Sequence, residues 1–423
     1  MKNIKQILDE QIELVKPNSK TLNEIKTLTN DFVKNLEKKI KSKKIYAEVF
    51  VGGSLAKGTL IKKKNYDVDI FVRFDKKYDD NEISTLLGKI IDKNAKRVHG
   101  SRDYYKIIIK EIIFEVIPVL KIKKISEARN ITDLSYFHVN YIKNKLKKNK
   151  KLADEIILAK TFAHAQNCYG AESYIHGFSG YSLELLICHY NGFLNFLKEI
   201  SKVDTKKEKK IIDDKKFYKN KEEVLRELNE AKTQSPIILI DPTFKERNAL
   251  AGLSYETLER FKENCVKFLK NPNEKFFSPK NLREELSNRY GKDLKVIEIK
   301  TDKQAGDIAG SKSKKFFEFF VSKLEKEFIV KLKEFEYDED KNTAYFYLVV
   351  NKKDDEILKG PPATNVHNLA RFKKVHPGAF IKNQIAYAKI KHNLSFEEFV
   401  KKFKIKNKKV IKEMSVNNVK MLR

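Results

Sequence analysis

The stretch VGGSLAKGTLIKKKNYDVDIFVRF, residues 51–74, decides the fold because it joins a glycine turn to a strand that carries two acids. In an extended strand, successive side chains point to opposite faces. Asp67 and Asp69 therefore share one face of the predicted strand, while Val68 and Ile70 lie on the other. Two neighbouring carboxylates repel each other, so the pattern predicts a divalent cation between them, and Mg²⁺ prefers carboxylate oxygens together with substrate phosphates.

A third acid, Glu115, lies in the apolar run IIFEVIPV. A charge in such a strand is costly unless a metal or a partner compensates it. Three acids on adjacent strands predict a two-metal site, in which one ion lowers the pKa of an attacking hydroxyl and the other holds a triphosphate. The predicted reaction class is phosphoryl transfer.

The glycine turn before the two acids is suited to bind the phosphates. Gly52 and Gly53 let the backbone approach an anion, Ser54 can donate to a phosphate oxygen, and Lys57 can neutralise its charge. Each signal alone has a plainer explanation, because Asp-x-Asp pairs are common on surfaces, Gly-Gly-Ser is more often a plain turn, and Glu115 could be a core acid with a partner. Their order along one segment favours the catalytic interpretation.

Hydrophobic periodicity predicts an α/β organisation for the first 140 residues. Residues 1–43 predict helix with a break at Pro17. The segments IYAEVFV, DVDIFVRF and KIIIKEIIFEVIPVL predict strands, bounded by Gly52-Gly53 and Pro118.

The rest of the chain predicts a helical region, followed by a region of mixed helices and strands. Residues 140–270 predict helices, with an exposed insert in the charged stretch SKVDTKKEKKIIDDKKFYKNKEE. Beyond NPNEKFFSPK, the segments DLKVIEIK, TAYFYLVV and FIKNQIAYAKIK predict strands, and SKKFFEFFVSKLEKEF predicts a helix. Ser395 and Glu398 in SFEEF form the pattern of a capping box, which predicts a last short helix.

Composition limits the classes of protein. A chain of 423 residues is too long for one ordinary core, so two or three domains are expected. The net charge of +30, from 88 Lys plus Arg against 58 Asp plus Glu, favours a nucleic acid partner, although a base-biased genome that places lysine on solvated faces explains part of the excess. The three cysteines have no metal-ligand spacing and are expected to be reduced. With no apolar run long enough to span a bilayer, we expect a cytoplasmic protein without a membrane partner.

Several motifs together carry a family resemblance. GGSLAKGT followed by DVD resembles the signature of the DNA polymerase β-like nucleotidyltransferase superfamily, with Glu115 at the place of its third acid. YGAESYIHGFSGYSLELL, IDPTFKERNALAGLS and FFSPK resemble the archaeal, class I, CCA-adding enzymes, which are tRNA nucleotidyltransferases. The resemblance extends to GPPATNVHNLARFKK near the end of the chain.

This resemblance implies template-independent addition of C, C and A to the 3′ end of tRNA, from CTP and ATP, with Mg²⁺. The implied fold is α+β and multidomain. A nucleotidyltransferase palm with a small mixed β-sheet would occupy residues 1–140, a helical neck that completes the nucleotide pocket residues 141–275, and an α+β body and tail that binds the tRNA acceptor arm residues 276–423. The sequence does not decide between a monomer and a homodimer.

The resemblance also implies roles for the acids and the turn. Asp67, Asp69 and Glu115 would bind Mg²⁺, and Glu115 would help to activate the 3′-hydroxyl of the primer. The third acid is usually Asp in the family, and the extra methylene of Glu could shift a metal by about 1 Å. The triphosphate would be contacted by the turn residues Gly53, Ser54 and Lys57.

Five further residues match nucleotide-binding positions of the family. His138, Lys160 and Tyr169 match positions that hold the sugar and phosphates, with Ser135 at a neighbouring hydroxyl position. Arg247 matches an arginine that presents hydrogen-bond donors to the base. Without the resemblance, a snorkelling lysine, a packed tyrosine, a core histidine and a surface arginine are the plainer interpretations.

Two rival functions remain. A poly(A) polymerase or another terminal nucleotidyltransferase would share the chemistry of the two acids, and product length and CTP use distinguish it. A non-catalytic RNA-binding protein on the same scaffold is the other alternative, but such a relative would be expected to lose an acid, and this chain keeps three.

Overall fold

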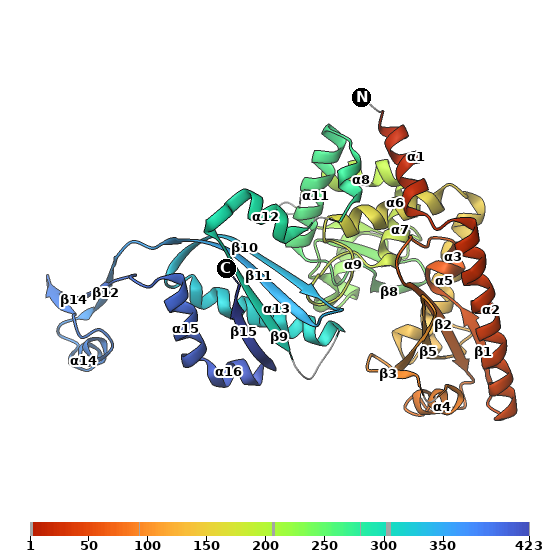
Figure 1. Cartoon of the computed structure of the whole chain (residues 1–423), viewed down its shortest axis with the longest axis horizontal. Coiled ribbons are helices and arrows are strands. Elements are labelled where there is room, and N and C mark those ends of the chain that lie inside the picture. Colours follow the sequence, from red (N-terminus) through yellow and green to blue (C-terminus); the bar gives the residue numbers. More distant parts are fainter. Residues whose placement is uncertain (1–2, 93, 205–207, 280, 302–305, 423) are drawn as a thin grey trace. The chain divides into compact units, whose positions relative to one another are not determined.

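The computed structural model describes residues 3–92, 94–204, 208–279, 281–301 and 306–422 (Figure 1). The chain forms two compact units, one made of Met1–Ala171 with Ile175–Pro279 and the other of Glu172–Tyr174 with Lys280–Arg423. The first unit contains both the predicted palm and the predicted neck, and the finer boundary at residue 140 stays a prediction. None of the described helices is long and apolar enough to cross a membrane.

Two helices open the first unit. Helix α1 spans Ile4–Val15 and helix α2 spans Ser19–Ser42, so the predicted break at Pro17 is confirmed. The side chain of Asn3 caps α1 and that of Asn18 caps α2, each by accepting a hydrogen bond from a backbone amide of the first turn.

A five-stranded sheet follows, in the order β1-β2-β5-β4-β3. Only β2 and β5 run parallel, so the predicted mixed sheet is confirmed. The short helix α3, Gly53–Lys57, joins β1 to β2, and α4, Ile83–Ile90, follows β2. The strands are β1 Ala47–Val51, β2 Tyr66–Phe74, β3 Lys96–Val98, β4 Tyr104–Ile109 and β5 Ile112–Leu120.

Pro118 lies inside β5 and does not end it, so this predicted boundary is wrong. The pairing of β4 with β5 ends at Val116, whereas β2 pairs with β5 as far as Leu120. A proline lacks an amide donor and is tolerated where one side of a strand has no neighbour.

One face of this sheet is covered by α2, which Figure 1 shows running along it. Val68, Ile70 and Phe114 on this face are completely buried, and the ring of Phe32 from α2 stacks on Phe114 with 4.3 Å between centroids. Because side chains alternate along a strand, this packing leaves Asp67 and Asp69 on the opposite face.

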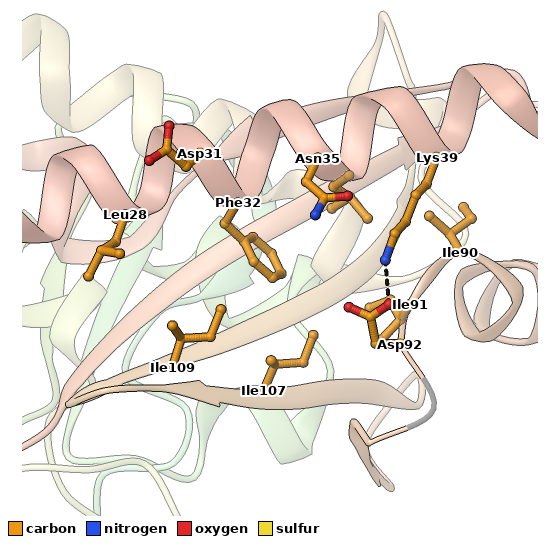
Figure 2. Close-up of a pocket in the computed structure, with 11 residues that line it drawn as sticks. Leu28, Asp31, Phe32, Asn35, Lys39, Ile90, Ile91, Asp92, Ile107 and Ile109 are labelled. Atoms are coloured by element: carbon orange, nitrogen blue, oxygen red, sulfur yellow. Dashed lines mark hydrogen bonds and ion pairs between the residues drawn. The ribbon is translucent and has the colours of Figure 1, made fainter.

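A cavity of about 240 Å³ opens on the helix-covered face, between α2, the end of α4 and β4 (Figure 2). Ile107 and Ile109 line its floor, and the ion pair between Lys39 and Asp92 lies at one end. Ile107 pairs with Phe114 in the sheet register, so the cavity lies on the face away from the three acids.

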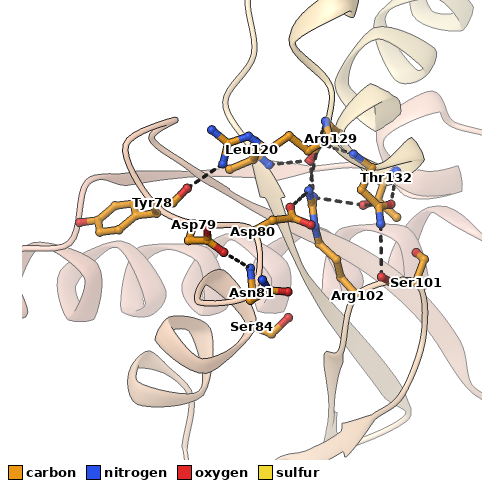
Figure 3. A network of polar contacts seen from close by, with 12 residues as sticks. Tyr78, Asp79, Asp80, Asn81, Ser84, Ser101, Arg102, Leu120, Arg129 and Thr132 are labelled. Carbon is orange, nitrogen blue, oxygen red and sulfur yellow. Dashed lines mark hydrogen bonds and ion pairs between the residues drawn. The ribbon is translucent and has the colours of Figure 1, made fainter.

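A buried polar network anchors the turn between β3 and β4 (Figure 3). The guanidinium of Arg102 binds the carboxylates of Asp80 and of Asp133, whose side chain is fully buried. Asp133 also accepts hydrogen bonds from the backbone amides of Leu120 at 2.7 Å and of Arg129 and Asn130 at 3.0 Å. The network fixes the segment that leads into the next helix.

The remainder of the first unit is mainly helical, as predicted. Phe162 on α6 packs against the rings of Phe193, Phe261 and Phe268, which join three helices into one core. The helices are η1 Ile125–Glu127, η2 Ile131–Leu134, α5 Ser135–Lys148, α6 Leu152–Ala165, α7 Gly180–Tyr190, α8 Phe193–Ser201, α9 Lys221–Glu227, α10 Glu230–Thr233, α11 Tyr255–Lys270 and η3 Glu274–Phe277.

The helical region also contains a three-stranded sheet that the sequence analysis did not predict. Strands β6, Lys210–Ile212, and β7, Ile237–Asp241, are parallel, and β8, Phe244–Asn248, is antiparallel to β7. Ile212 is buried although it lies in the charged insert that we expected to be exposed. Two isoleucines between charged residues give too short a pattern to predict a strand.

The second unit is α+β, as predicted. Its four-stranded antiparallel sheet has the order β10-β11-β9-β15, and α13 packs Phe316, Phe317 and Phe320 against Phe346 of β11. The predicted capping box at Ser395 and Glu398 is confirmed at the start of α15. The elements of this unit are α12 Leu282–Tyr290, η4 Gly291–Asp293, β9 Leu294–Thr301, α13 Gly306–Leu324, β10 Phe328–Asp338, β11 Thr343–Lys352, β12 Glu356–Pro362, α14 Val366–Val375, β13 Phe380–Lys382, β14 Ile385–Ile390, α15 Phe396–Lys406, α16 Lys408–Glu413 and β15 Val416–Met421.

Candidate active site

The glycine turn and the acid strand are in direct contact. Gly53 begins α3 with φ +58°, and a Cβ atom placed on it would lie 1.7 Å from Oδ2 of Asp69. The backbone amide of Gly52 donates a 2.8 Å hydrogen bond to the carbonyl oxygen of Asp69. Only glycine allows this turn to lie against the carboxylate, so the two parts of the opening stretch form one structural unit.

The sheet register places the three acids on one face. Asp69 pairs directly with Glu115 across the parallel strands β2 and β5, and Asp67 lies two residues earlier on β2. Burial, together with the negative charges of Glu115 and Asp67, raises the pKa of Asp69 to about 6. The positive charges of Lys57 and Lys160 lower this pKa, but they do not offset burial and the two neighbouring acids.

Lysines contact the other two acids. The Nζ atom of Lys106 on β4 lies 2.8 Å from a Glu115 carboxylate oxygen, and that of Lys63 lies 3.5 Å from Asp67. Within the described parts of the chain, no group of three or more His, Cys, Asp or Glu side chains is arranged to hold a metal ion. Asp67 and Asp69 supply the hard oxygen donors that suit a divalent cation. Glu115 would have to exchange its partner Lys106 to join them.

Lys57 and Lys160 meet at one carboxylate that the sequence analysis did not identify. Lys57, at the end of α3, lies 2.6 Å from Oε2 of Glu184, and Lys160, on α6, lies 2.8 Å from its Oε1. Lys160 also donates to the hydroxyl of Thr59 at 3.1 Å. Burial would raise the pKa of Glu184, but the two lysines hold it below its ordinary value. Both predicted phosphate-binding lysines thus lie in one charged cluster.

Tyr169 lies beside this cluster. Gly180, the first residue of α7, has no side chain, and a Cβ atom there would come 2.8 Å from the hydroxyl of Tyr169 and 3.7 Å from Cε of Lys160. The ring of Tyr169 also stacks on His164 with 3.9 Å between centroids. The predicted tyrosine and lysine are therefore neighbours across a glycine.

His138 and Arg247 also meet at a carboxylate that the sequence analysis did not identify. Oδ2 of Asp241 lies 2.7 Å from Nη1 of Arg247 and 3.1 Å from Nε2 of His138. The other carboxylate oxygen accepts from the hydroxyls of Tyr181 at 3.0 Å and Thr243 at 2.7 Å.

The charges of this second cluster follow from its burial. Burial lowers the pKa of His138, so a neutral imidazole is favoured near pH 7 and Arg247 is the cation that balances Asp241. Burial would raise the pKa of Asp241, but its contacts with His138, Arg247 and Thr243 hold it well below its usual range. The ring of Tyr181 stacks on His138 with 4.4 Å between centroids, and the guanidinium of Arg247 lies 5.5 Å from the centroid of the Tyr181 ring.

The two serines are placed near the clusters without joining them. Ser54 lies in α3 and Ser135 is the first residue of α5, and both are half-buried. Among the described residues, neither hydroxyl donates a hydrogen bond to another predicted site residue.

The residues that the sequence analysis missed connect those that it found. Tyr181 and Glu184 are three positions apart on α7, so they lie on neighbouring parts of one helix surface. One signal for Glu184 was present, because a lone acid in the apolar run SLELLI is costly unless it has a partner. Asp241 had no comparable signal, because its strand was not predicted.

Two family models match the first unit. Residues 154–278 match the model described as "tRNA nucleotidyltransferase, second domain", and residues 1–153 match the one described as "Second Messenger Oligonucleotide or Dinucleotide Synthetase domain". The boundary between them falls within α6, close to Lys160.

Curated relatives match most of the chain. The CCA-adding enzyme of Nanoarchaeum equitans is 36% identical over 339 residues, which cover 79% of this chain and 81% of that enzyme. The CCA-adding enzyme of Methanocaldococcus jannaschii is 29% identical over 393 residues, which cover 90% of this chain and 86% of that enzyme.

Solved structures share the nucleotidyltransferase fold. A cytoplasmic RNA terminal U-transferase superposes with a TM-score of 0.52 at 14% identity, over 66% of this chain and 99% of that one. A structure of the Cid1 poly(U) polymerase gives a TM-score of 0.52 at 14% identity, over 65% of this chain and 98% of that one. At this level of identity the similarity concerns the fold.

Proposed function

This chain belongs to the archaeal CCA-adding enzymes, and from that premise we propose that it adds C, C and A to the 3′ end of tRNA from CTP and ATP. The observation that carries the proposal is the 36% identity to the Nanoarchaeum equitans enzyme over 79% of this chain. The two charged clusters support the assignment of roles to individual residues.

Nucleotidyltransferases use divalent metal ions, and we assign them to Asp67 and Asp69, with Glu115 as the third ligand after it leaves Lys106. Mg²⁺ is the proposed ion because it binds few carboxylates together with phosphate oxygens. Bound there, such ions would acidify the 3′-hydroxyl of the primer and neutralise the triphosphate.

We assign the phosphate contacts to the cluster around Glu184, which contains Lys57 and Lys160. Lys57, Lys160 and the hydroxyl of Tyr169 would bind the triphosphate, with Ser54 and the backbone at Gly53 beside it. The 3′-oxygen of tRNA attacks the α-phosphorus, a new phosphodiester bond forms, and pyrophosphate leaves with its added negative charge. Cationic groups fixed near the leaving oxygens stabilise this charge.

We assign the base and sugar contacts to the cluster around Asp241, which contains His138 and Arg247. Arg247 is held by Asp241, so its guanidinium has a defined position from which to donate to acceptor atoms of cytosine or adenine. His138, with a lowered pKa, would contact the sugar as a neutral group, and Ser135 lies one turn earlier on α5.

The remaining assignments follow the family. The proposed division is a palm over residues 1–140, a neck over 141–275 and a tRNA-binding body and tail over 276–423. The net charge of +30 favours contacts with the tRNA backbone, which should weaken steeply with salt. We further propose a cytoplasmic location, and a homodimer stays a prediction that sedimentation would test.

The test uses a tRNA transcript without its CCA end, Mg²⁺, and CTP, ATP or both, with products separated at single-nucleotide length. We expect two additions with CTP alone and a third only when ATP is also present. Asp67→Ala, whose side chain is exposed, should fold normally and add nothing.

Other outcomes would change the assignment. A long ladder of adenosines would indicate a poly(A) polymerase or another terminal nucleotidyltransferase. Binding of tRNA without extension would leave a non-catalytic RNA-binding protein.

A further inference from the structure

Glu184 is a fully buried carboxylate whose partners all come from other elements. Its two oxygens contact Lys57 of α3 at 2.6 Å and Lys160 of α6 at 2.8 Å, and the hydroxyl of Thr59 lies 3.4 Å away. The side chains of both lysines are almost entirely buried, with exposed fractions of 9% for Lys57 and 5% for Lys160. Three charges thus share a site from which water is largely excluded.

Two buried ammonium groups do not stay close together without an anion. Each is costly to remove from water, and they repel each other. Burial and the charge of Lys57 lower the pKa of Lys160, while Glu184 and Asp69 raise it. Glu184 is thus the principal group that favours the charged form of Lys160.

We propose that Glu184 is a positioning residue for catalysis, which holds Lys57 and Lys160 in place to receive the triphosphate of the incoming nucleotide. The inference rests on the proposed function, in which these lysines bind the triphosphate. Glu184 itself does not contact the nucleotide. It links the palm helix α3 to the helices α6 and α7, so the phosphate site is formed before the nucleotide binds.

Loss of Glu184 has two opposing electrostatic effects. It removes a negative charge near the triphosphate, which alone would strengthen nucleotide binding. It also removes the counter-charge that keeps Lys160 protonated and both ammonium groups in place, which weakens binding. The second effect should dominate because the cluster is buried, where an unbalanced charge is neutralised or displaced.

The experiment compares wild type, Glu184→Gln and Glu184→Asp in CCA addition with separate titrations of CTP, ATP and tRNA. In Glu184→Gln we expect the KM values for CTP and ATP to rise together by about 10- to 100-fold, the effect of losing a hydrogen bond to a charged group. The KM for tRNA should stay within about threefold, because a triphosphate site does not contact tRNA. Glu184→Asp keeps the charge and should restore most of the affinity.

Glu155→Gln is the matched control. Glu155 lies on α6 like Lys160, but its carboxylate accepts a 2.7 Å hydrogen bond from the backbone amide of Phe193. The same chemical change there should leave the KM values for CTP and ATP unchanged. A rise in these values in both variants would mean that Glu184 acts only through the stability of the helices and would overturn the proposal.

Calorimetric titration of the folded, tRNA-free protein with CTP and with inorganic tripolyphosphate tests the role of Glu184 separately from the proposed function. Both ligands should bind Glu184→Gln more weakly by the same factor, since they share the phosphate contacts. Unchanged or tighter binding would overturn the role of Glu184 while CCA addition by the wild type still stood. Binding of CTP that depends on Glu184, without CCA addition by the wild type, would overturn the proposed function and leave this inference standing.

Discussion

Two buried carboxylates of the first unit, Asp133 and Glu184, are bound in different ways. Asp133 accepts hydrogen bonds from three backbone amides and from Arg102, and the three amides belong to residues that are near it in the sequence. Glu184 is bound by side chains alone, from residues that are 24 to 127 positions away.

This difference indicates that Asp133 stabilises the fold, whereas Glu184 positions side chains of the site. Backbone amides are fixed once the chain is folded, so Asp133 fixes one arrangement of the backbone around it. Lysine side chains can turn from a carboxylate to a phosphate without any change of the backbone. The comparison therefore predicts that changes near Asp133 affect stability, whereas changes among the site carboxylates affect catalysis or nucleotide binding.

The largest expected effect is that of Asp69→Asn. The variant loses a carboxylate that we assign to metal binding, so kcat/KM for CTP addition should fall by about 10³-fold or more. Single-turnover extension of a tRNA that lacks CCA measures this loss. Activity within tenfold of wild type would show that the acid strand does not carry the chemistry.

The same variant should not be less stable. The pKa of Asp69 is raised to about 6, so the metal-free wild type loses stability as the pH rises from about 4 to above 6, where the buried carboxylate ionises. Asp69→Asn removes this loss and should be more stable than wild type at pH 7 by about 1 to 3 kcal/mol, and by less at pH 4. Denaturant unfolding with a chelator present checks the sign.

Arg102→Met should have the opposite effect. It leaves the buried carboxylate of Asp133 with its amide donors but without a cation, which should lower the free energy of unfolding by about 3 kcal/mol. Below the melting temperature of the variant, kcat and the KM for CTP should match those of wild type. A specific loss of nucleotide affinity here would break the distinction between the two carboxylates.

Asp241→Asn tests whether a carboxylate of the site can affect both nucleotide binding and the stability of the fold. The variant loses the anion that orients Arg247 and His138, so the KM for CTP should rise about tenfold and UTP should be misincorporated more often. Competition between CTP and UTP on one tRNA measures the selectivity. A higher KM with unchanged selectivity would place the effect of Asp241 away from the base.

Its effect on stability depends on pH. Because the folded protein holds the pKa of Asp241 well below its usual range, the carboxylate stabilises the fold above about pH 4, and this contribution is lost as the pH falls further. The stability difference between wild type and Asp241→Asn should therefore be largest near pH 7 and should shrink towards pH 3. A constant difference over this range would contradict the ionised pair with Arg247.

The smallest expected effect is that of Lys106→Ala. Its ion pair with Glu115 is partly exposed, and such pairs contribute about 1 kcal/mol or less. Because removing the lysine frees Glu115 for metal, the Mg²⁺ concentration for half-maximal activity should fall by about fivefold or less. A requirement for more Mg²⁺ would mean that Lys106 supports the metal-binding position of Glu115.

Sequence patterns predicted much of the fold and part of the site. The period of two in DVDIFVRF predicted that Asp67 and Asp69 share a face, and the capping box predicted the start of α15, because both depend on neighbours in the chain. The small sheet of β6 to β8 was missed, because its short strands become stable only when they pair with each other. Asp241 ends β7 of this sheet, so its place in the site could not be predicted either.

The sequence by itself determined the glycine turn, the acid strand, the helical periodicity and the family resemblance, since these are properties of residues close together in the chain. Only the tertiary structure decided that Lys57 and Lys160 share Glu184, that His138 and Arg247 share Asp241, and that Glu115 faces Lys106. The contacts of Glu184 with Lys57 and Lys160, and those of Asp241 with His138, join segments that are distant in the chain, whereas Lys106 and Glu115 face each other across the hairpin of β4 and β5. The strength of these contacts depends on burial, which no local pattern specifies, because a charge costs little in water and must find its partner only when the chain folds around it.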